Sequence, residues 1–236
     1  MRARGRRVPD GPFGVAALEA GPALATERAN AFTLAQEELS AIAAHGVVRS
    51  YPKQAVILNE GDSSDSLYIV LEGRVKAYVA DAAGHEVVLS MMGPGEYFGE
   101  MALDRRPRSA SIMTVAASRF LIVPGDEFRA FVTDHPAFAL SLVEKLIHRV
   151  RALTESVKSL AFMDVYGRVA RLLLELAEDH DGRLVIDERL TQQDIASRVG
   201  ASREMVSRIL KDLSLCGCIT HSRSGIVLHR KPPARW

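Results

Sequence analysis

The chain has 236 residues, of which 47% are hydrophobic and 25% charged, so it is too apolar for a disordered protein and long enough for two ordinary domains. Its formal net charge is only +1, but residues 189–236 contain nine Lys/Arg and three Asp/Glu, a local excess of 9 − 3 = +6. A basic terminal region on a near-neutral chain is typical of nucleic-acid binding. The sequence offers no nucleophile–base set, phosphate-binding glycine loop or metal-ligand cluster, so we expect neither an enzyme nor a metal site.

Residues 1–30 begin with arginines and then become alanine-rich. Glu19, Gly21 and Pro22 interrupt the apolar run before it reaches the length of a secretory signal. No later stretch approaches the length of a membrane span. We therefore expect residues 1–30 to be a mobile arm of a cytoplasmic protein.

The two cysteines, Cys216 and Cys218, are separated by one residue. On an extended strand such side chains lie too far apart to form a disulfide, and two cysteines do not supply the four ligands of a zinc site. We expect two reduced thiols that are buried or half-buried.

The first half of the chain predicts a short helix at 33–46, capped by Thr33, and then a series of short alternating strands over 47–124. Five glycines separate these strands at spacings of roughly ten residues: Gly61, Gly73, Gly84, Gly93 and Gly95. Such spacing favours an antiparallel roll or barrel. A further short helix follows and ends before Pro136. Residues 31–136 are thus predicted to form one antiparallel β-roll domain.

Residues 137–163 carry the longest helical pattern. Apolar residues recur at steps of three and four, with valine at every a position of the heptad and leucine at every d position: Val143, Leu146, Val150, Leu153, Val157 and Leu160. Branched residues at a with leucine at d favour a parallel two-stranded pair. We name these six residues the heptad row and expect a homodimer. The alternative is a helix that packs only on its own domain.

The remaining residues, 164–236, predict a helical domain that binds DNA. Asp164 can cap a helix that extends towards Gly182, and residues 191–213 have the spacing of a helix-turn-helix with Gly200 at the turn. The segment 216–230 then predicts two strands joined by a turn, the shape of a wing. The fold class expected for the whole chain is α+β.

The second helix of this motif presents polar side chains that suit base recognition. Arginine can bind a guanine edge through two hydrogen bonds, glutamate can accept from cytosine, and a serine at the helix start can contact phosphate. The predicted DNA-binding residues are Thr191, Gln193, Ser202, Arg203, Glu204, Ser207 and Arg208. A dimer with such helices implies a palindromic operator with half-sites about 34 Å apart.

The segments "YPKQAVILNEGD", "GEMAL", "PRSA" and "GASREMVSRIL" resemble the catabolite activator (cyclic AMP receptor) family, within the group that includes the fumarate-nitrate and carbon-monoxide regulators. The likeness extends from about residue 33 to residue 230. It implies a cyclic-nucleotide-binding sheet domain, a long dimerisation helix, a DNA-binding winged helix-turn-helix and RNA polymerase as a partner. By this match Arg203, Glu204 and Arg208 would read a TGTGA-like half-site.

Within this resemblance, residues 96–112 look like the phosphate-binding segment of the family. Gly99 would let the backbone approach the ligand, and Glu100 would accept from the ribose hydroxyl. Arg108 would pair with the cyclic phosphate and Ser109 would donate hydrogen bonds, beside a short helix that begins near Glu100. A buried phosphate diester does need a cation and several donors. The alternative is an exposed turn rich in arginine.

The match to the catabolite activator also places Leu153 and Thr154 where that activator has a Thr-Ser pair at the adenine. Thr154 keeps one hydroxyl there, whereas Leu153 cannot hydrogen-bond to a base and departs from the activator. Leu89 and Ser90 are assigned to the wall of the pocket. The family resemblance makes cyclic AMP the first predicted effector.

The loop between Glu100 and Arg108 departs from the activator. It is two residues shorter and carries Arg105 and Arg106. Additional positive charge would suit a second phosphate, so cyclic di-GMP is the second predicted effector.

Two alternatives within the same superfamily stay open. One is a haem or redox sensor, for which His85 is the one histidine in the strand region, while no cysteines are present for an iron–sulfur cluster. The other is a dimer that binds DNA without an effector.

Overall fold

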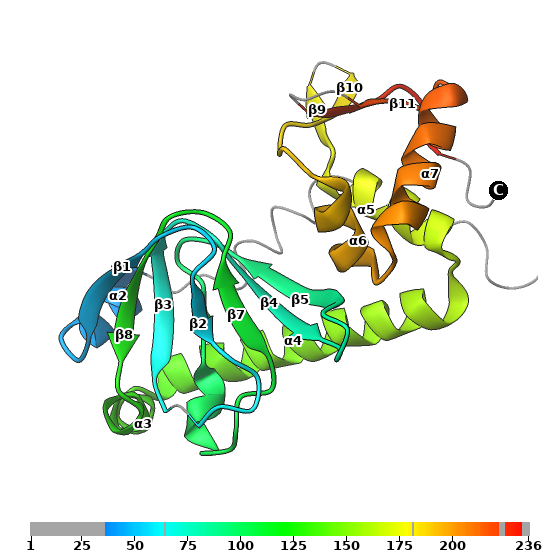
Figure 1. The fold of residues 1–236 in the computed structure, drawn as a ribbon. Coiled ribbons are helices and arrows are strands. Elements are labelled where there is room, and N and C mark those ends of the chain that lie inside the picture. Colours follow the sequence, from blue (N-terminus) through cyan, green and yellow to red (C-terminus); the bar gives the residue numbers. More distant parts are fainter. Residues whose placement is uncertain (1–35, 64, 181, 222–224, 233–236) are drawn as a thin grey trace, which may run out of the picture.

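The computed structural model describes residues 36–63, 65–180, 182–221 and 225–232 (Figure 1). The predicted arm at 1–30 and the predicted cap Thr33 lie outside these ranges. The first described element is α2 (Gln36–Ala43), which buries Ile42 in the same apolar cluster as the strands that follow.

The N-terminal half is an antiparallel β-roll, as predicted. One sheet has the order β1-β8-β3-β6 and the other β2-β7-β4-β5. The strands are β1 (Val47–Tyr51), β2 (Val56–Leu58), β3 (Leu67–Glu72), β4 (Val75–Ala80), β5 (Glu86–Met92), β6 (Tyr97–Phe98), β7 (Ser111–Thr114) and β8 (Ser118–Val123). Alternate side chains of the strands meet inside the roll, where Phe98 and Phe120 pack edge to face at 5.6 Å.

Two helices follow the roll, α3 (Gly125–Asp134) and α4 (Pro136–Phe162). Pro136 is the first residue of α4, a position at which the missing N–H of proline costs no hydrogen bond. The first three turns of α4 bury Phe138, Leu142 and Lys145. Beyond them α4 continues past the roll towards the C-terminal helices (Figure 1).

The C-terminal part begins with α5 (Val165–Leu176), which Asp164 caps by accepting from the Gly167 N–H at 2.7 Å. The prediction that this helix continues towards Gly182 was wrong. It ends at Leu176, and β9 (Glu178–His180) pairs antiparallel with β10 (Arg183–Ile186). The sequence after Leu176 loses its apolar period, and Gly182 turns the chain with a φ of 82°.

The winged helix-turn-helix is present as predicted, with α6 (Gln192–Val199), α7 (Arg203–Leu215), β11 (Ile219–His221) and β12 (Ile226–Leu228). The two predicted wing strands join the unpredicted pair in one sheet of order β11-β12-β10-β9. One apolar cluster joins α5, α6, α7 and this sheet, and it includes the fully buried Leu173, Ile195 and Leu213. The α+β fold class is thus confirmed.

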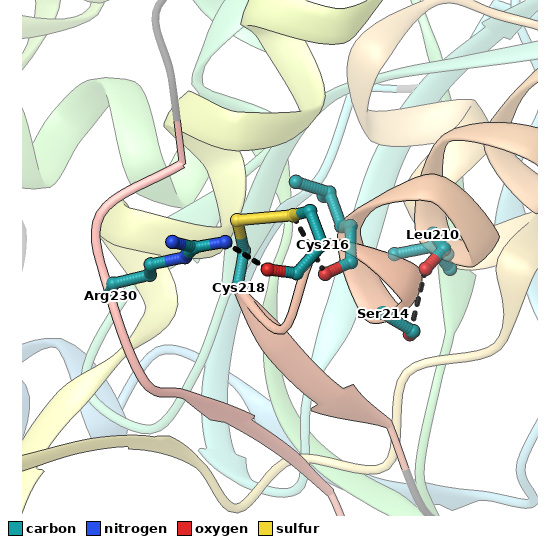
Figure 2. Close-up of a disulfide and its surroundings, with 6 residues drawn as sticks. Leu210, Ser214, Cys216, Cys218 and Arg230 are labelled. Carbon is teal, nitrogen blue, oxygen red and sulfur yellow. Dashed lines mark hydrogen bonds between the residues drawn. A yellow bond between two sulfur atoms is a disulfide. The ribbon is translucent and has the colours of Figure 1, made fainter.

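The expectation of two reduced thiols was wrong, because the structure joins Cys216 and Cys218 in a disulfide (Figure 2). That expectation assumed that residues 216–218 lie on an extended strand. Instead Cys216 ends α7 in a helical conformation and Gly217 has a φ of 68°, so the chain reverses and the two Cα atoms lie 5.5 Å apart. That separation lies within the usual range for disulfides. Arg230 donates to the Cys216 carbonyl at the same turn (Figure 2).

The two halves of the chain also meet away from α4. Helix α6 packs against β5 of the roll. Glu188, just before α6, accepts from Arg198 at 2.9 Å and pairs with Arg74 of the roll at 3.4 Å. The helix-turn-helix is therefore held against the roll by packing and by one bridging carboxylate.

Candidate functional site

The predicted phosphate-binding segment follows β6 and contains one turn of 3-10 helix, η2 (Glu100–Leu103). Gly99 precedes it with a φ of 87°, a left-handed conformation that side chains with a Cβ rarely adopt. A Cβ on Gly99 would lie 2.6 Å from the Ser66 carbonyl oxygen and 3.3 Å from Nη1 of Arg108. Only glycine allows the backbone to pass this close to the arginine.

Arg108 lies directly beside Gly99 and is only 4% exposed. Its Nη1 donates to the Gly99 carbonyl at 2.9 Å and its Nη2 donates to the Ser66 carbonyl at 2.8 Å. Burial lowers the pKa of Arg108, and the nearby Tyr68 and Glu100 oppose that shift. The two carbonyls fix the guanidinium at the end of the roll, where a buried cation favours an anion.

Glu100 is 5% exposed and forms an ion pair with Arg149 of α4. The Nη2 atom of Arg149 also lies 3.8 Å from the sulfur of Met92. Sequence analysis missed Arg149. Its position one helical turn before the predicted ligand residue Leu153 was the feature of the sequence that could have identified it. The ion pair joins the predicted ribose-binding carboxylate to the long helix.

Lys145, one turn before Arg149, also reaches the roll and was missed. Its Nζ donates to the Tyr97 carbonyl at 2.8 Å. The structure thus brings Gly99, Glu100 and Arg108 together with two cations of α4.

The other predicted ligand residues lie around this group. The Ser109 hydroxyl is exposed and donates to the Met101 sulfur at 3.0 Å. On β5, Leu89 is exposed and Ser90 is half-buried opposite Ala77. On α4, Leu153 is exposed, and the Thr154 hydroxyl donates to the Val150 carbonyl of its own helix at 2.9 Å.

The two additional arginines of the loop are exposed. Arg105 has a φ of 57° and its Nη2 lies 3.5 Å from an Asp126 oxygen. The Nε of Arg106 lies 4.0 Å from an Asp104 oxygen. Their positive charge is partly balanced by surface carboxylates.

The helix-turn-helix is shaped by two caps and a left-handed turn. Thr191 and Asp194 form a reciprocal capping box at the start of α6. Gly200 has a φ of 63° and ends α6, and Ser202 caps α7 by accepting from the Met205 N–H. Arg168 of α5 donates to the Val199 and Gly200 carbonyls at 2.8 and 3.3 Å. These bonds fix the angle between the two helices.

Helix α7 buries Val206, Ile209 and Leu213 and leaves its polar face accessible. The predicted base-reading residues Arg203, Glu204 and Arg208 are exposed, and Ser207 is half-buried. A pocket at the start of α6 is lined by four residues that include three of the predicted set: Thr191, Gln192, Gln193 and Arg203. Three of the seven predicted DNA-binding residues therefore line one surface.

The heptad row forms an apolar surface on α4. All six residues are between 40% and 64% exposed in this chain. Leu140 and Ile147 extend the same exposed apolar face. An exposed apolar stripe of this length indicates a surface that another protein covers.

His85, the histidine considered for haem, lies at the exposed β4–β5 turn, and its Nδ1 is 2.9 Å from an Asp81 oxygen. That hydrogen bond lowers the pKa of Asp81. Among the residues that the structure describes, no three His, Cys, Asp or Glu side chains are grouped to hold a metal ion. No helix within the same ranges is long and apolar enough to cross a bilayer.

Comparison with known proteins identifies both halves of the chain. The family model of the cyclic nucleotide-binding domain matches residues 48–135, and that of the Crp-like helix-turn-helix domain matches residues 167–232. These two domains in this order define a class of ligand-controlled transcription regulators. The chain belongs to the catabolite activator (cyclic AMP receptor) and fumarate-nitrate regulator family, which confirms the resemblance.

Curated relatives extend over most of the chain. It is 36% identical over 174 residues to a CRP-like cAMP-activated global transcriptional regulator of Mycobacterium tuberculosis, covering 72% of this chain and 78% of that protein. It is 31% identical over 190 residues to the cAMP-activated global transcriptional regulator CRP of Salmonella typhimurium. That match covers 78% of this chain and 90% of that protein. The structure of the c-di-GMP responsive global regulator CLP of Xanthomonas campestris matches with a TM-score of 0.75 and 27% identity. That match covers 82% of this chain and 99% of the CLP chain.

Replacing Gly99 by alanine tests the close approach of backbone and arginine. We expect Gly99→Ala to lower the free energy of unfolding by about 3 kcal/mol or more, because it combines a left-handed φ with a backbone clash. Gly84→Ala is the matched control, since Gly84 has a φ of 81° and open space around it, and should cost only about 1 kcal/mol. Urea unfolding measures both. Equal losses would contradict the close approach.

Proposed function

We propose that the protein is a homodimeric, cytoplasmic transcription regulator that binds a cyclic nucleotide and a palindromic operator. In this proposal residues 31–136 form the effector domain, 137–163 the dimerisation helix and 164–236 the DNA-binding domain, preceded by the arm at 1–30. The observation that carries the proposal is the buried Arg108 beside Gly99 and Glu100. A buried guanidinium held by carbonyl oxygens gains most from a ligand with an ionised phosphate.

Cyclic AMP is the proposed effector, with cyclic di-GMP as the second candidate. The curated relatives named above are cAMP-activated, and the similar structure is a c-di-GMP responsive regulator. One buried arginine suits one phosphate. Arg105 and Arg106 are exposed and lie beside surface carboxylates, so their geometry gives less support to a second phosphate site. Gly99, Glu100, Arg108 and Ser109 would contact the ribose phosphate.

The remaining pocket residues have supporting roles in this proposal. Leu89 and Ser90 of β5 would form the wall, and Leu153 and Thr154 would face the base. Thr154 lies on the same helix as the heptad row, so a second copy of α4 would bring its hydroxyl to the partner's pocket.

The exposed heptad row supports a second copy of this chain as the dimer partner. Pairing along α4 would cover its valines and leucines from solvent. A dimer also presents two α7 helices to two half-sites of a TGTGA-like operator. We propose that RNA polymerase is the protein partner of the complex on DNA.

Replacing Arg108 by leucine tests the effector site. We expect Arg108→Leu to weaken cyclic AMP binding by about 100-fold or more, because the phosphate loses charge-assisted hydrogen bonds. Arg106→Leu is the matched control, as Arg106 is an exposed arginine of the same loop. Isothermal titration with cyclic AMP and cyclic di-GMP measures both variants.

The control also separates the two effectors. If cyclic AMP is the effector, Arg106→Leu leaves its affinity unchanged. If cyclic di-GMP binds and Arg106→Leu abolishes that binding, the second candidate is correct. A wild-type protein that binds neither nucleotide but binds its operator would support the effector-independent alternative.

Replacing Val150 by glutamate tests the dimer. A carboxylate at a central a position would have to be buried opposite its own copy, so we expect self-association to weaken by about 100-fold or more. Ala152→Glu adds the same charge at an exposed position outside the heptad row and should leave the dimer intact. Sedimentation velocity measures both variants. A dimeric Val150→Glu protein would overturn the proposed interface.

Replacing Arg208 by alanine tests base recognition. We expect a loss of about 1–3 kcal/mol for the preferred operator and relaxed discrimination at one base pair. Lys211→Ala removes an exposed cation of the same helix and should weaken specific and non-specific DNA binding by similar factors. Fluorescence anisotropy with operator variants measures both. Unchanged discrimination in Arg208→Ala would exclude it as a base-reading residue.

A further inference from the structure

Lys145 is one of three charged side chains that are buried among the residues the structure describes. It is 3% exposed, and lysine is almost never buried to this extent without a partner. Its ammonium donates to the Tyr97 carbonyl at 2.8 Å and lies 3.0 Å from the centroid of the Tyr97 ring. The contact joins α4 to β6, two residues before Gly99.

The charged groups that face Lys145 come from three elements. Glu96 precedes β6 and Glu100 lies in η2, and both carboxylates favour the charged lysine. Arg149, on the same helix as Lys145, disfavours it and is itself paired with Glu100. Two buried groups, Lys145 and Glu100, and two half-buried ones, Glu96 and Arg149, therefore lie close together.

Burial shifts the pKa of two members of this group, Lys145 and Glu96. Burial lowers the pKa of Lys145 from 10.5 to about 7, and Glu100 opposes that shift. Burial also raises the pKa of Glu96, whose carboxylate accepts from the Gly93 N–H at 2.7 Å and is near Arg74. The charge arriving with a ligand can therefore change the protonation of Lys145.

Filling the space between α4 and β6 does not by itself require an amine. Leucine or methionine would fill the space between α4 and β6 without the desolvation cost of a buried charge. The carbonyl that Lys145 holds belongs to the strand that leads directly into Gly99 and Glu100. Its helical neighbour Arg149 holds Glu100 itself.

We propose that Lys145 is a positioning residue of the effector site, which holds β6 against α4 and becomes more strongly bound to the roll when an anionic effector enters. The proposal rests on the proposed function, since it requires a cyclic phosphate near Arg108 and Glu100. The added negative charge stabilises the ammonium, so the pKa of Lys145 rises in the complex.

The sign of the pH dependence follows from this linkage. A ligand that raises the pKa of Lys145 binds the protonated protein more tightly. Effector affinity should thus be highest below about pH 7 and fall as the pH rises through the pKa of the unliganded protein. The cyclic phosphate diester stays ionised throughout this range.

Isothermal titration with cyclic AMP in two buffers of different ionisation enthalpy tests the proposal. The wild-type protein should take up protons on binding, and its affinity should fall about tenfold between about pH 6.5 and about pH 8.5, the change that a rise of one pKa unit produces. Lys145→Met should show neither effect. Lys145→Arg should bind with no pH dependence, because a guanidinium keeps its charge. A wild-type affinity independent of pH would overturn the proposal.

Two further outcomes distinguish an incorrect role for Lys145 from an incorrect effector site. Binding without proton uptake would overturn the role of Lys145 alone, whereas no binding of any cyclic nucleotide at any pH would overturn both. Competitive acetylation with acetic anhydride is a second test. It uses the wild-type protein, so it does not require that any variant folds. At about pH 7, cyclic AMP should reduce the labelling of Lys145 severalfold, as the amine becomes protonated. Unchanged labelling would contradict the proposal.

Discussion

The contact between α4 and the segment after β6 is the interaction on which the rest of the structure depends. Lys145 holds the Tyr97 carbonyl and Arg149 holds the Glu100 carboxylate, one helical turn apart. The same helix of 27 residues carries the exposed heptad row, and its Leu160 approaches Gly200 at the turn between α6 and α7. A helix of that length spans about 40 Å. One helix thus touches the proposed effector site, the apolar surface and the DNA-binding module.

This arrangement limits how an effector can act. A ligand shifts an equilibrium only by the difference in its affinity for the two states. Glu100 is bound to Arg149, so α4 controls the position of the carboxylate to which the proposal assigns the ribose hydroxyl. The module that carries α6 and α7 is also held by packing on β5 and by Glu188 between Arg198 and Arg74. The DNA-binding module therefore contacts the roll directly as well as α4.

Sequence patterns predicted local features better than long-range contacts. The heptad row and the helix-turn-helix follow from periods of three and four residues and from Gly200, all readable within a short window. The pairing of Glu100 with Arg149 joins residues 49 positions apart, and no local period marks it. The strands β9 and β10 were missed because the preceding helix was expected to continue towards Gly182, and the disulfide because Gly217 turns the chain where a strand was expected.

The buried charged side chains of the chain lie close together. Among the described residues, the buried charged side chains are Glu100, Arg108 and Lys145, and all three lie around the segment from β6 to β7. Apolar residues of similar volume at such positions are often equal or better for stability. The apolar clusters of the roll and of the winged helix consist of other residues, so these three charges stand outside them. Their desolvation is offset by carbonyl oxygens and by Arg149, which leaves a small group whose charge balance responds to an incoming anion.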